Sequence, residues 1–264
     1  MKRILTVFLS IALIFSFTSI VVAKPVAPEA PSAPNGPSRP DTPEVSGDYA
    51  VPNRSDIRVR VFVHGPKPKQ PTESVTATVC VDPDSNAAVD WAGWKLPQGV
   101  WTYQLNPGSA PSSVGGSNAA TISATVFNTW QQAVNNKVSF ARGSDTSLTR
   151  SAFDSKNIVA WGRTSSRALG VTYVTYYVAS REVADVDTIL NKRVPWGVLT
   201  SCGDTTRYDF QDILTHELGH WIGLDDEYDV SYVDNTMYGY GSKGEIKKNT
   251  LTTGDRANLA TMYP

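Results

Sequence analysis

Two histidines and a glutamate form the most chemically suggestive group in the 264-residue sequence. His216, Glu217 and His220 stand in the run THELGHWIGLDDEYD, residues 215–229. Residues four apart lie one above the other on a helix, so both imidazoles can aim at one metal ion. Glu217 lies about 100° further round the helix, where its carboxylate can reach a metal-bound water. The spacing predicts metal-assisted hydrolysis with Glu217 as the general base.

A third metal ligand has to be found elsewhere, because the chain has three histidines and the last one, His64, lies far upstream. A catalytic zinc normally takes three protein ligands and leaves one position open. Gly223 follows His220 by three residues, and glycine adopts the left-handed conformation that ends a helix sharply. The chain can then fold back beneath the metal, where the acids at 225–227 each offer a carboxylate.

The helix, the glycine, the acids and the later run TMYGYG together resemble the metzincin metallopeptidases. Their motif is His-Glu-x-x-His-x-x-Gly-x-x-His, with Asp as the last ligand in some members, followed by a turn that contains methionine. The run LTTGDRANLATMYP resembles the matrixin branch, in the form found in microbial secreted proteins. The resemblance covers roughly residues 87–264.

This resemblance implies a secreted zinc endopeptidase and assigns a role to each residue of the motif. It makes Glu217 the general base and places Met237 beneath the zinc. The implied zinc ligands are His216, His220 and Asp226. Asp225 and Glu227 remain alternatives to Asp226, because zinc also accepts carboxylate oxygen from either.

The implied fold is α+β, with a twisted five-stranded mixed sheet, a backing helix, an active-site helix and a C-terminal helix. The run LGVTYVTYYV, residues 169–178, is expected to be its antiparallel edge strand, to which a peptide substrate can add as a further strand. Hydrophobic patterns predict the other elements. The predicted strands are 99–106, 137–142, 157–162 and 184–191, and the predicted helices are 119–136, 209–224 with Asp209 as N-cap, and a short closing helix capped by Thr252 or Thr253.

One catalytic Zn²⁺ is the expected cofactor. Matrixins commonly hold a second, structural zinc through histidines, and this chain has too few histidines for one. Calcium sites also occur in the family. The acids after the catalytic helix and those in ADVDTILN, residues 184–191, are candidates for Ca²⁺, although neither forms a contiguous calcium-loop pattern.

The N-terminal part divides into three predicted segments before the catalytic domain at 87–264. Residues 1–23 have the charged start, apolar middle and small-residue end of a signal peptide, and an uncleaved membrane anchor is the alternative. Residues 24–47 carry proline at every third position from 25 to 43, which is typical of a stiff polyproline II spacer. Residues 48–86 form an extension in which 56–81 are predicted to be a β-hairpin.

Two features of this extension bear on the site. His64 falls at the end of a predicted strand, where a lone histidine is usually polar surface. Cys80 and Cys202 are the only cysteines, and in an exported chain they predict one disulfide that ties the extension to the catalytic domain. The alternative is that Cys80 occupies the zinc in a latent form, which would leave Cys202 unpaired.

Composition limits the function classes. A net charge of -1 and 19% charged residues give no basic bias toward nucleic acid. The expected partner is a protein or peptide substrate, with a membrane involved only if the N-terminal segment stays uncleaved, and the expected state is a monomer that is secreted or attached to the cell surface. The competing hypothesis is a catalytically silent surface binding module on a metzincin fold.

Overall fold

The computed structural model describes residues 44–68, 84–165 and 167–264. The predicted signal peptide, most of the proline-rich spacer, Cys80 and the second arm of the predicted 56–81 hairpin lie outside these residues. Among the described helices, none combines the length and apolar character needed to cross a membrane.

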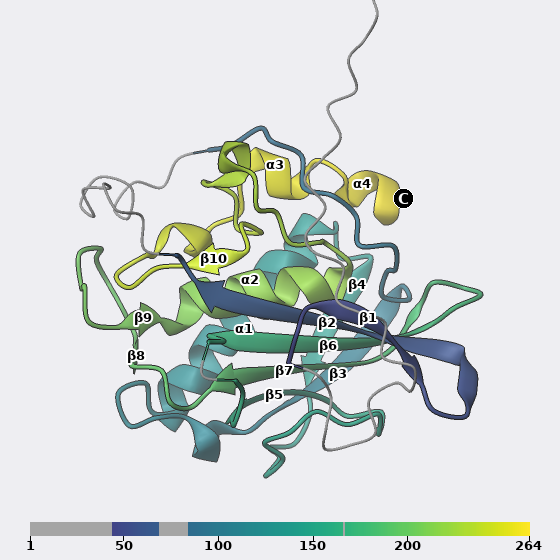
Figure 1. The fold of residues 1–264 in the computed structure, drawn as a ribbon, viewed down its shortest axis with the longest axis horizontal. Helices are drawn as coiled ribbons and strands as arrows, with labels where there is room; N and C mark the ends of the chain where they lie inside the picture. The colour runs from purple at the N-terminus through teal and green to yellow at the C-terminus, as the bar shows by residue number, and fades with distance from the viewer. Residues whose placement is uncertain (1–43, 69–83, 166) are drawn as a thin grey trace, which may run out of the picture.

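The fold is α+β and is built on one mixed sheet (Figure 1). Its strands are β1 (Gly47–Val51), β2 (Arg54–Pro66), β3 (Gly99–Leu105), β4 (Val138–Arg142), β5 (Asn157–Gly162), β6 (Gly170–Tyr177), β7 (Val183–Asn191) and β10 (Tyr240–Gly241). They are ordered β1-β2-β6-β7-β5-β3-β4, and β10 pairs with β2. A separate pair is formed by β8 (Trp196–Gly197) and β9 (Tyr208–Asp209). The strands predicted from hydrophobic pattern within residues 87–264 are therefore all present, with small differences at their ends.

The predictions of a five-stranded sheet and of an exposed edge at 169–178 are wrong. Strands β4, β3, β5 and β7 run parallel and β6 runs antiparallel to β7, but β6 is internal in this sheet. The N-terminal strand β2 pairs antiparallel with β6 from Ile57↔Tyr177 to His64↔Gly170. The described first arm of the extension is β-rich and apolar on alternate residues, and it continues the sheet.

Two long helices lie on one face of the sheet (Figure 1). Helix α1 (Gly116–Ala133) and helix α2 (Phe210–Ile222) pack on each other and on the sheet. The indole of Trp130 in α1 donates a hydrogen bond of 2.8 Å to the carbonyl oxygen of Thr215 in α2. The predicted closing helix is two short helices, α3 (Thr253–Arg256) and α4 (Leu259–Met262), and Thr252 caps the first in a capping box.

The sheet buries apolar side chains on both faces. The larger cluster joins the helices to residues such as Phe62, Trp161 and Val174. A smaller cluster on the opposite face includes Val61, Val171 and Ile189. Strand β2 contributes to both clusters, because successive side chains of a strand point to opposite faces. Phe62 and Val61 are both fully buried, so β2 is an integral part of the described core.

Candidate metal centre

Helix α2 carries the first two candidate ligands, and both of its ends are fixed as predicted. The side chain of Asp209 accepts a hydrogen bond from the backbone N–H of Asp212 and caps the N-terminus. Gly223 ends the helix with φ 104° and ψ 16°, the left-handed conformation. A side chain at Gly223 would also collide with the carbonyl oxygen of Trp94. The sharp turn brings the following acids back under the helix.

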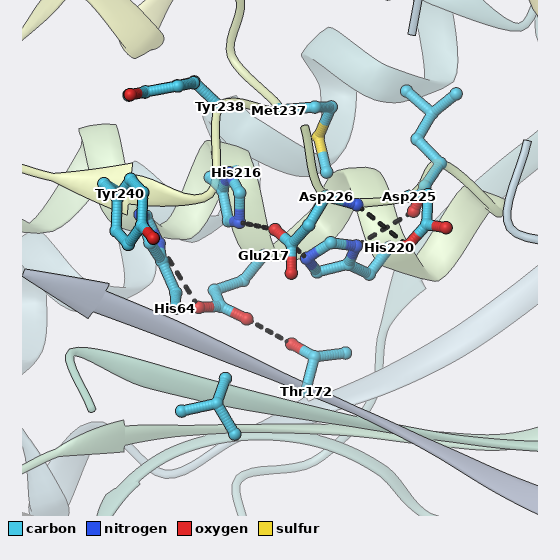
Figure 2. A network of polar contacts seen from close by, with 12 residues as sticks. His64, Thr172, His216, Glu217, His220, Asp225, Asp226, Met237, Tyr238 and Tyr240 are labelled. Carbon is cyan, nitrogen blue, oxygen red and sulfur yellow. Dashed lines mark hydrogen bonds and ion pairs between the residues drawn. The ribbon is translucent and has the colours of Figure 1, made fainter. Parts of the chain in front are cut away.

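Three donor atoms converge beyond that turn (Figure 2). Oδ1 of Asp226 lies 3.1 Å from Nε2 of His216 and 3.5 Å from Nε2 of His220. Ligand atoms about 2.0–2.1 Å from a tetrahedral zinc are separated by about 3.3 Å. The three atoms are also buried polar atoms without a hydrogen bond in the described structure. Their spacing and their unmet polarity fit a zinc ion, with His216, His220 and Asp226 as the residues that would hold it.

Backbone carbonyls orient both imidazoles toward that centre. Nδ1 of His216 lies 2.8 Å from the carbonyl oxygen of Thr236, and Nδ1 of His220 lies 2.9 Å from that of Leu224. A carbonyl can only accept, so each Nδ1 carries the proton and each Nε2 presents its lone pair. This is the tautomer that metal ligation through Nε2 requires.

The two neighbouring acids are engaged elsewhere. Oδ1 of Asp225 accepts the backbone N–H of Asp226 at 3.0 Å and lies 3.5 Å from the guanidinium of Arg60. Oε1 of Glu227 accepts the backbone N–H of Asp90 at 2.9 Å. In contrast, the second oxygen of Asp226 accepts a hydrogen bond from the Tyr228 hydroxyl, which leaves Oδ1 facing the histidines. Of the three acids, Asp226 alone belongs to the convergent group.

The protonation states also suit a cation. Burial lowers the pKa of His216 to about 4, so this imidazole is neutral near pH 7. Burial would raise the pKa of Asp226, but the adjacent His220 and His216 hold it well below its ordinary value. Burial would likewise lower the pKa of His220, and the Asp226 carboxylate outweighs that effect and raises it. An ionised carboxylate beside two imidazoles is a suitable set of ligands for a cation. Binding of the cation would release any proton held at the ligand atoms.

Met237 lies under the helix at this point, as the resemblance implies. The chain has no room for a side chain at Gly219, where a Cβ would collide with Sδ of Met237. Met237 is fully buried, and its backbone N–H donates to Oδ1 of Asp255 at 3.3 Å. Oδ2 of Asp255 accepts the N–H groups of Thr236 and Thr252 at 3.0 and 2.8 Å. One buried carboxylate from α3 therefore fixes the methionine turn.

Glu217 is fully buried between α2 and β6 (Figure 2). Its Oε2 accepts a hydrogen bond of 2.6 Å from the hydroxyl of Thr172. A Cβ at Gly170 would collide with Oε1. Burial raises the pKa of Glu217 to about 7, against an ordinary value of 4.5. A carboxyl with this pKa can both accept and return a proton near neutral pH.

His64 and Phe62, both on β2, cover this group of residues. The ring of Phe62 stacks on His220 at 3.8 Å and 7°, and the ring of His64 lies 3.8 Å from that of His216. Nδ1 of His64 is 3.6 Å from Oε1 of Glu217. The expectation that His64 is polar surface is wrong, because it is fully buried. Its alternation with valines indicated a strand, but only the pairing of β2 with β6 brings it to the site.

Sequence reasoning also missed three residues that support the site: Thr172, Lys248 and Asp255. Lys248 is fully buried, and its ammonium donates to the carbonyl oxygens of Tyr238 and Tyr240 at 2.6 and 2.9 Å. The sequence marks Lys248 only by its position in the closing segment, and a lysine at that position could equally be exposed. The capping pattern at Thr252 did indicate a helix start, but not that Asp255 reaches the methionine turn.

The acids in ADVDTILN that are candidates for calcium accept hydrogen bonds from the backbone. Oδ2 of Asp185 accepts the N–H of Ser155 at 2.7 Å. Asp187 accepts the N–H groups of Ala152 and Ile158 at 2.7 and 3.0 Å. The described residues place neither acid in a cluster of potential metal ligands. Cys80 lies outside the described residues, so its disulfide with Cys202 stays a prediction.

The chain matches none of the protein families with which it was compared, and it matches none of the curated proteins.

Proposed function

We propose that the chain is a zinc-dependent endopeptidase of the metzincin kind, similar to the matrixin branch. The observation that carries this proposal is the convergence of His216, His220 and Asp226 at ligand spacing beside Glu217. The left-handed Gly223 and the buried Met237 support it, because they stand where the long motif requires a turn and a methionine.

The arrangement of strands gives further support. Strands β4, β3, β5, β7 and β6 follow one another in the sheet, and β6 is the antiparallel member. The resemblance implies a mixed sheet for residues 87–264, and these strands form one within a described sheet of eight strands.

Bound zinc supplies a Lewis acid that polarises a substrate carbonyl and makes a water ligand acidic. Glu217 accepts a proton from the attacking water and passes it to the leaving amine of the peptide bond. Thr172 holds the other oxygen of this carboxylate, which keeps Oε1 turned toward the site. The Asp ligand makes the centre less positive than one with three histidines. The proposed substrate is a protein or peptide, and the proposed setting is extracellular.

The competing proposal is a catalytically silent binding module. The observation in its favour is that β2 covers the site, so that His216, Glu217 and His220 are fully buried. Against it stands the raised pKa of Glu217, because a binding module needs neither this carboxylate nor its tuning.

The proposal is tested by measuring whether the zinc-loaded full-length chain cleaves denatured proteins and a quenched-peptide library. The assay is run on wild type and on Phe62→Ala/His64→Ala, since β2 covers the site. Glu217→Gln is the matched control, and we expect it to keep zinc and lose cleavage by at least about 100-fold, the usual scale for a general base. If neither chain cleaves with one zinc bound, the silent module is the better account.

A further inference from the structure

Lys248 places a fully buried ammonium against the residues of the candidate metal centre. The ammonium donates hydrogen bonds to the carbonyl oxygens of Tyr238 and Tyr240 at 2.6 and 2.9 Å, and Nζ lies 3.3 Å from Nε2 of His64. Three acceptors match the three N–H groups of an ammonium. Both carbonyls are neutral, and burial holds the pKa of His64 well below its ordinary value, so these acceptors do not neutralise the charge of Lys248.

The acids near Lys248 make their closest contacts with other groups. Oδ1 of Asp212 accepts the backbone N–H of Lys248 at 2.8 Å, and Oε1 of Glu245 lies 3.6 Å from the ammonium of Lys247. Burial lowers the pKa of Lys248, and Glu245 and Asp212 oppose that effect from a longer range. The described ion pairs join no carboxylate to the Lys248 ammonium, although an ammonium is costly to bury without an opposite charge close by.

His64 connects this ammonium to the metal centre. The ring of His64 lies 3.8 Å from the ring of His216, and its Nδ1 lies 3.6 Å from Oε1 of Glu217. Burial lowers the pKa of His216 and raises that of Glu217, and the charge of Lys248 adds to the first shift and opposes the second. Both effects are those of a positive charge that favours negative charge within the site.

The charges of the centre show where this ammonium is needed. A divalent cation held by Asp226 beside an ionised Glu217 forms a group with no net charge. An anion at the open ligand position makes the same group negative. A negative group in a buried site is costly without a counter-charge, and Lys248 holds a positive charge in a fixed position beside it.

We propose that the ammonium of Lys248 is the counter-charge for an anion at the open position of the metal centre, where it offsets the negative charges of Asp226 and Glu217. This inference rests on the proposed function and deepens it by naming the class of ligand that the centre favours. That class is a small anion, or a substrate oxygen that gains negative charge during the reaction. A fixed charge of this kind stabilises such an oxygen without reorganisation of the site.

Azide binding to the cobalt-substituted full-length chain tests this inference, because azide is a small anion and an added ligand changes the visible absorption of cobalt(II). Lys248→Met removes the charge, and Lys248→Arg keeps it. Lys247→Met is the matched control, since Lys247 is the neighbouring buried lysine, donates to the carbonyl oxygen of Val233 and is paired with Asp234 and Glu245. Cobalt affinity is measured on each protein by chelator competition.

We expect azide to bind at least about tenfold more weakly to Lys248→Met than to wild type, which is the scale of one unit charge at an effective dielectric constant of about 20. Lys248→Arg and Lys247→Met should stay close to wild type. Cobalt affinity should not fall in Lys248→Met, because removal of a positive charge does not weaken the attraction of the site for a cation.

Equal azide affinity in wild type and Lys248→Met, or no azide binding to cobalt-loaded wild type, would overturn the inference. A parallel loss of cobalt and azide affinity in Lys248→Met would also overturn it, because Lys248 would then only support the fold of the site. Azide affinity that depends on Lys248, in a chain that cleaves no peptide, would support the inference and refute the peptidase proposal. A wild-type chain that binds no cobalt would refute both.

Lys248→Gln covers failure of the methionine variant to fold. Its amide carries no charge but can still donate to the carbonyl oxygens of Tyr238 and Tyr240. Azide binding about tenfold weaker than in wild type supports the inference in this variant as well. Azide binding equal to that of wild type contradicts it.

Discussion

Thr172 on β6 donates a hydrogen bond to Glu217 on α2, with 2.6 Å between Oγ1 and Oε2. Thr172 also lies 2.7 Å from the hydroxyl of Thr188, which accepts from the indole N–H of Trp221 at 2.9 Å. The indole can only donate, and the Thr172 proton is committed to Glu217, so Thr188 donates to Thr172. The three hydrogen bonds therefore form one chain of donors, from Trp221 through Thr188 and Thr172 to the carboxylate of Glu217.

Thr172→Val is expected to weaken this support. Loss of the donor leaves Oε2 buried and unpaired, which costs about 1–3 kcal/mol of unfolding free energy. It also raises the pKa of Glu217 further, because a hydrogen bond to the carboxylate favours its charged form. In the Phe62→Ala/His64→Ala background, the acidic limb of the pH profile of kcat/KM should move to higher pH.

Thr175→Val is the matched control, since Thr175 is buried on the same strand and faces away from α2. An unshifted acidic limb in Thr172→Val would show that this hydroxyl does not position the base.

The buried Glu217 makes a specific contribution to the pH dependence of stability in metal-free protein. Its folded pKa of about 7 exceeds the ordinary value of 4.5, so the folded state holds the proton longer than the unfolded state. The contribution is present in full below pH 4.5 and is lost as the pH rises through 7. The unfolding free energy of wild type should fall relative to Glu217→Gln by up to about 1.4 kcal/mol per pH unit in this window.

Urea unfolding of both proteins across this pH range measures the difference. Using the difference removes the opposing titration of His216, which both proteins share. A constant difference would show that Glu217 is ionised in the folded state throughout.

Gly219→Ala should destabilise the protein, although alanine favours a helix by about 1 kcal/mol over glycine. The added Cβ collides with Sδ of Met237 beneath the helix, and overpacking typically costs about 1–3 kcal/mol. Unfolding of Gly219→Ala, Met237→Ala and the double variant forms a double-mutant cycle. We expect favourable coupling of about 0.5–3 kcal/mol, since the shorter side chain frees the space. Additive changes in unfolding free energy would mean that a side chain at position 219 and Met237 are not in steric conflict.

Asp255→Ala should destabilise the methionine turn and weaken zinc binding together. The change leaves the buried N–H groups of Thr236 and Thr252 without their acceptor, at about 1–3 kcal/mol each. Asp229→Ala is the matched control, because Asp229 caps a short exposed helix, Val230–Tyr232, by the same kind of bond. Equal losses in the two variants, measured by thermal unfolding and chelator competition, would contradict a special role for Asp255.

Much of this centre could be predicted from local pattern, because its parts are close in sequence. The spacing of His216 and His220, the left-handed Gly223 and the N-cap Asp209 each follow from helix geometry. The strands between residues 99 and 191 also follow, since each is a short run of β-branched and aromatic residues between turns. Asp226 required the resemblance, and the structure then separates it from Asp225 and Glu227 by their contacts.

The other features of the site and of the sheet depend on contacts between distant segments, which local sequence pattern does not predict. The alternation in β2 predicts a strand but not its partner, so the cover formed by Phe62 and His64 and the internal position of β6 were missed. Lys248, Asp255 and Thr172 look like ordinary polar residues until the fold buries them. Phe62 and His64 of the N-terminal extension contact the site, and Lys248 and Asp255 of the C-terminal segment support the turn beside it.

The central claim is that Asp226 completes a zinc centre with the two histidines of α2. The most direct measurement is zinc content and affinity, by chelator competition, of wild type, Asp226→Ala and Asp225→Ala. We expect one zinc per chain for wild type and Asp225→Ala. Asp226→Ala should lose more affinity than the about 10–100-fold that loss of an outer-shell partner costs. Wild-type affinity in Asp226→Ala, or no zinc in wild type, would contradict the account.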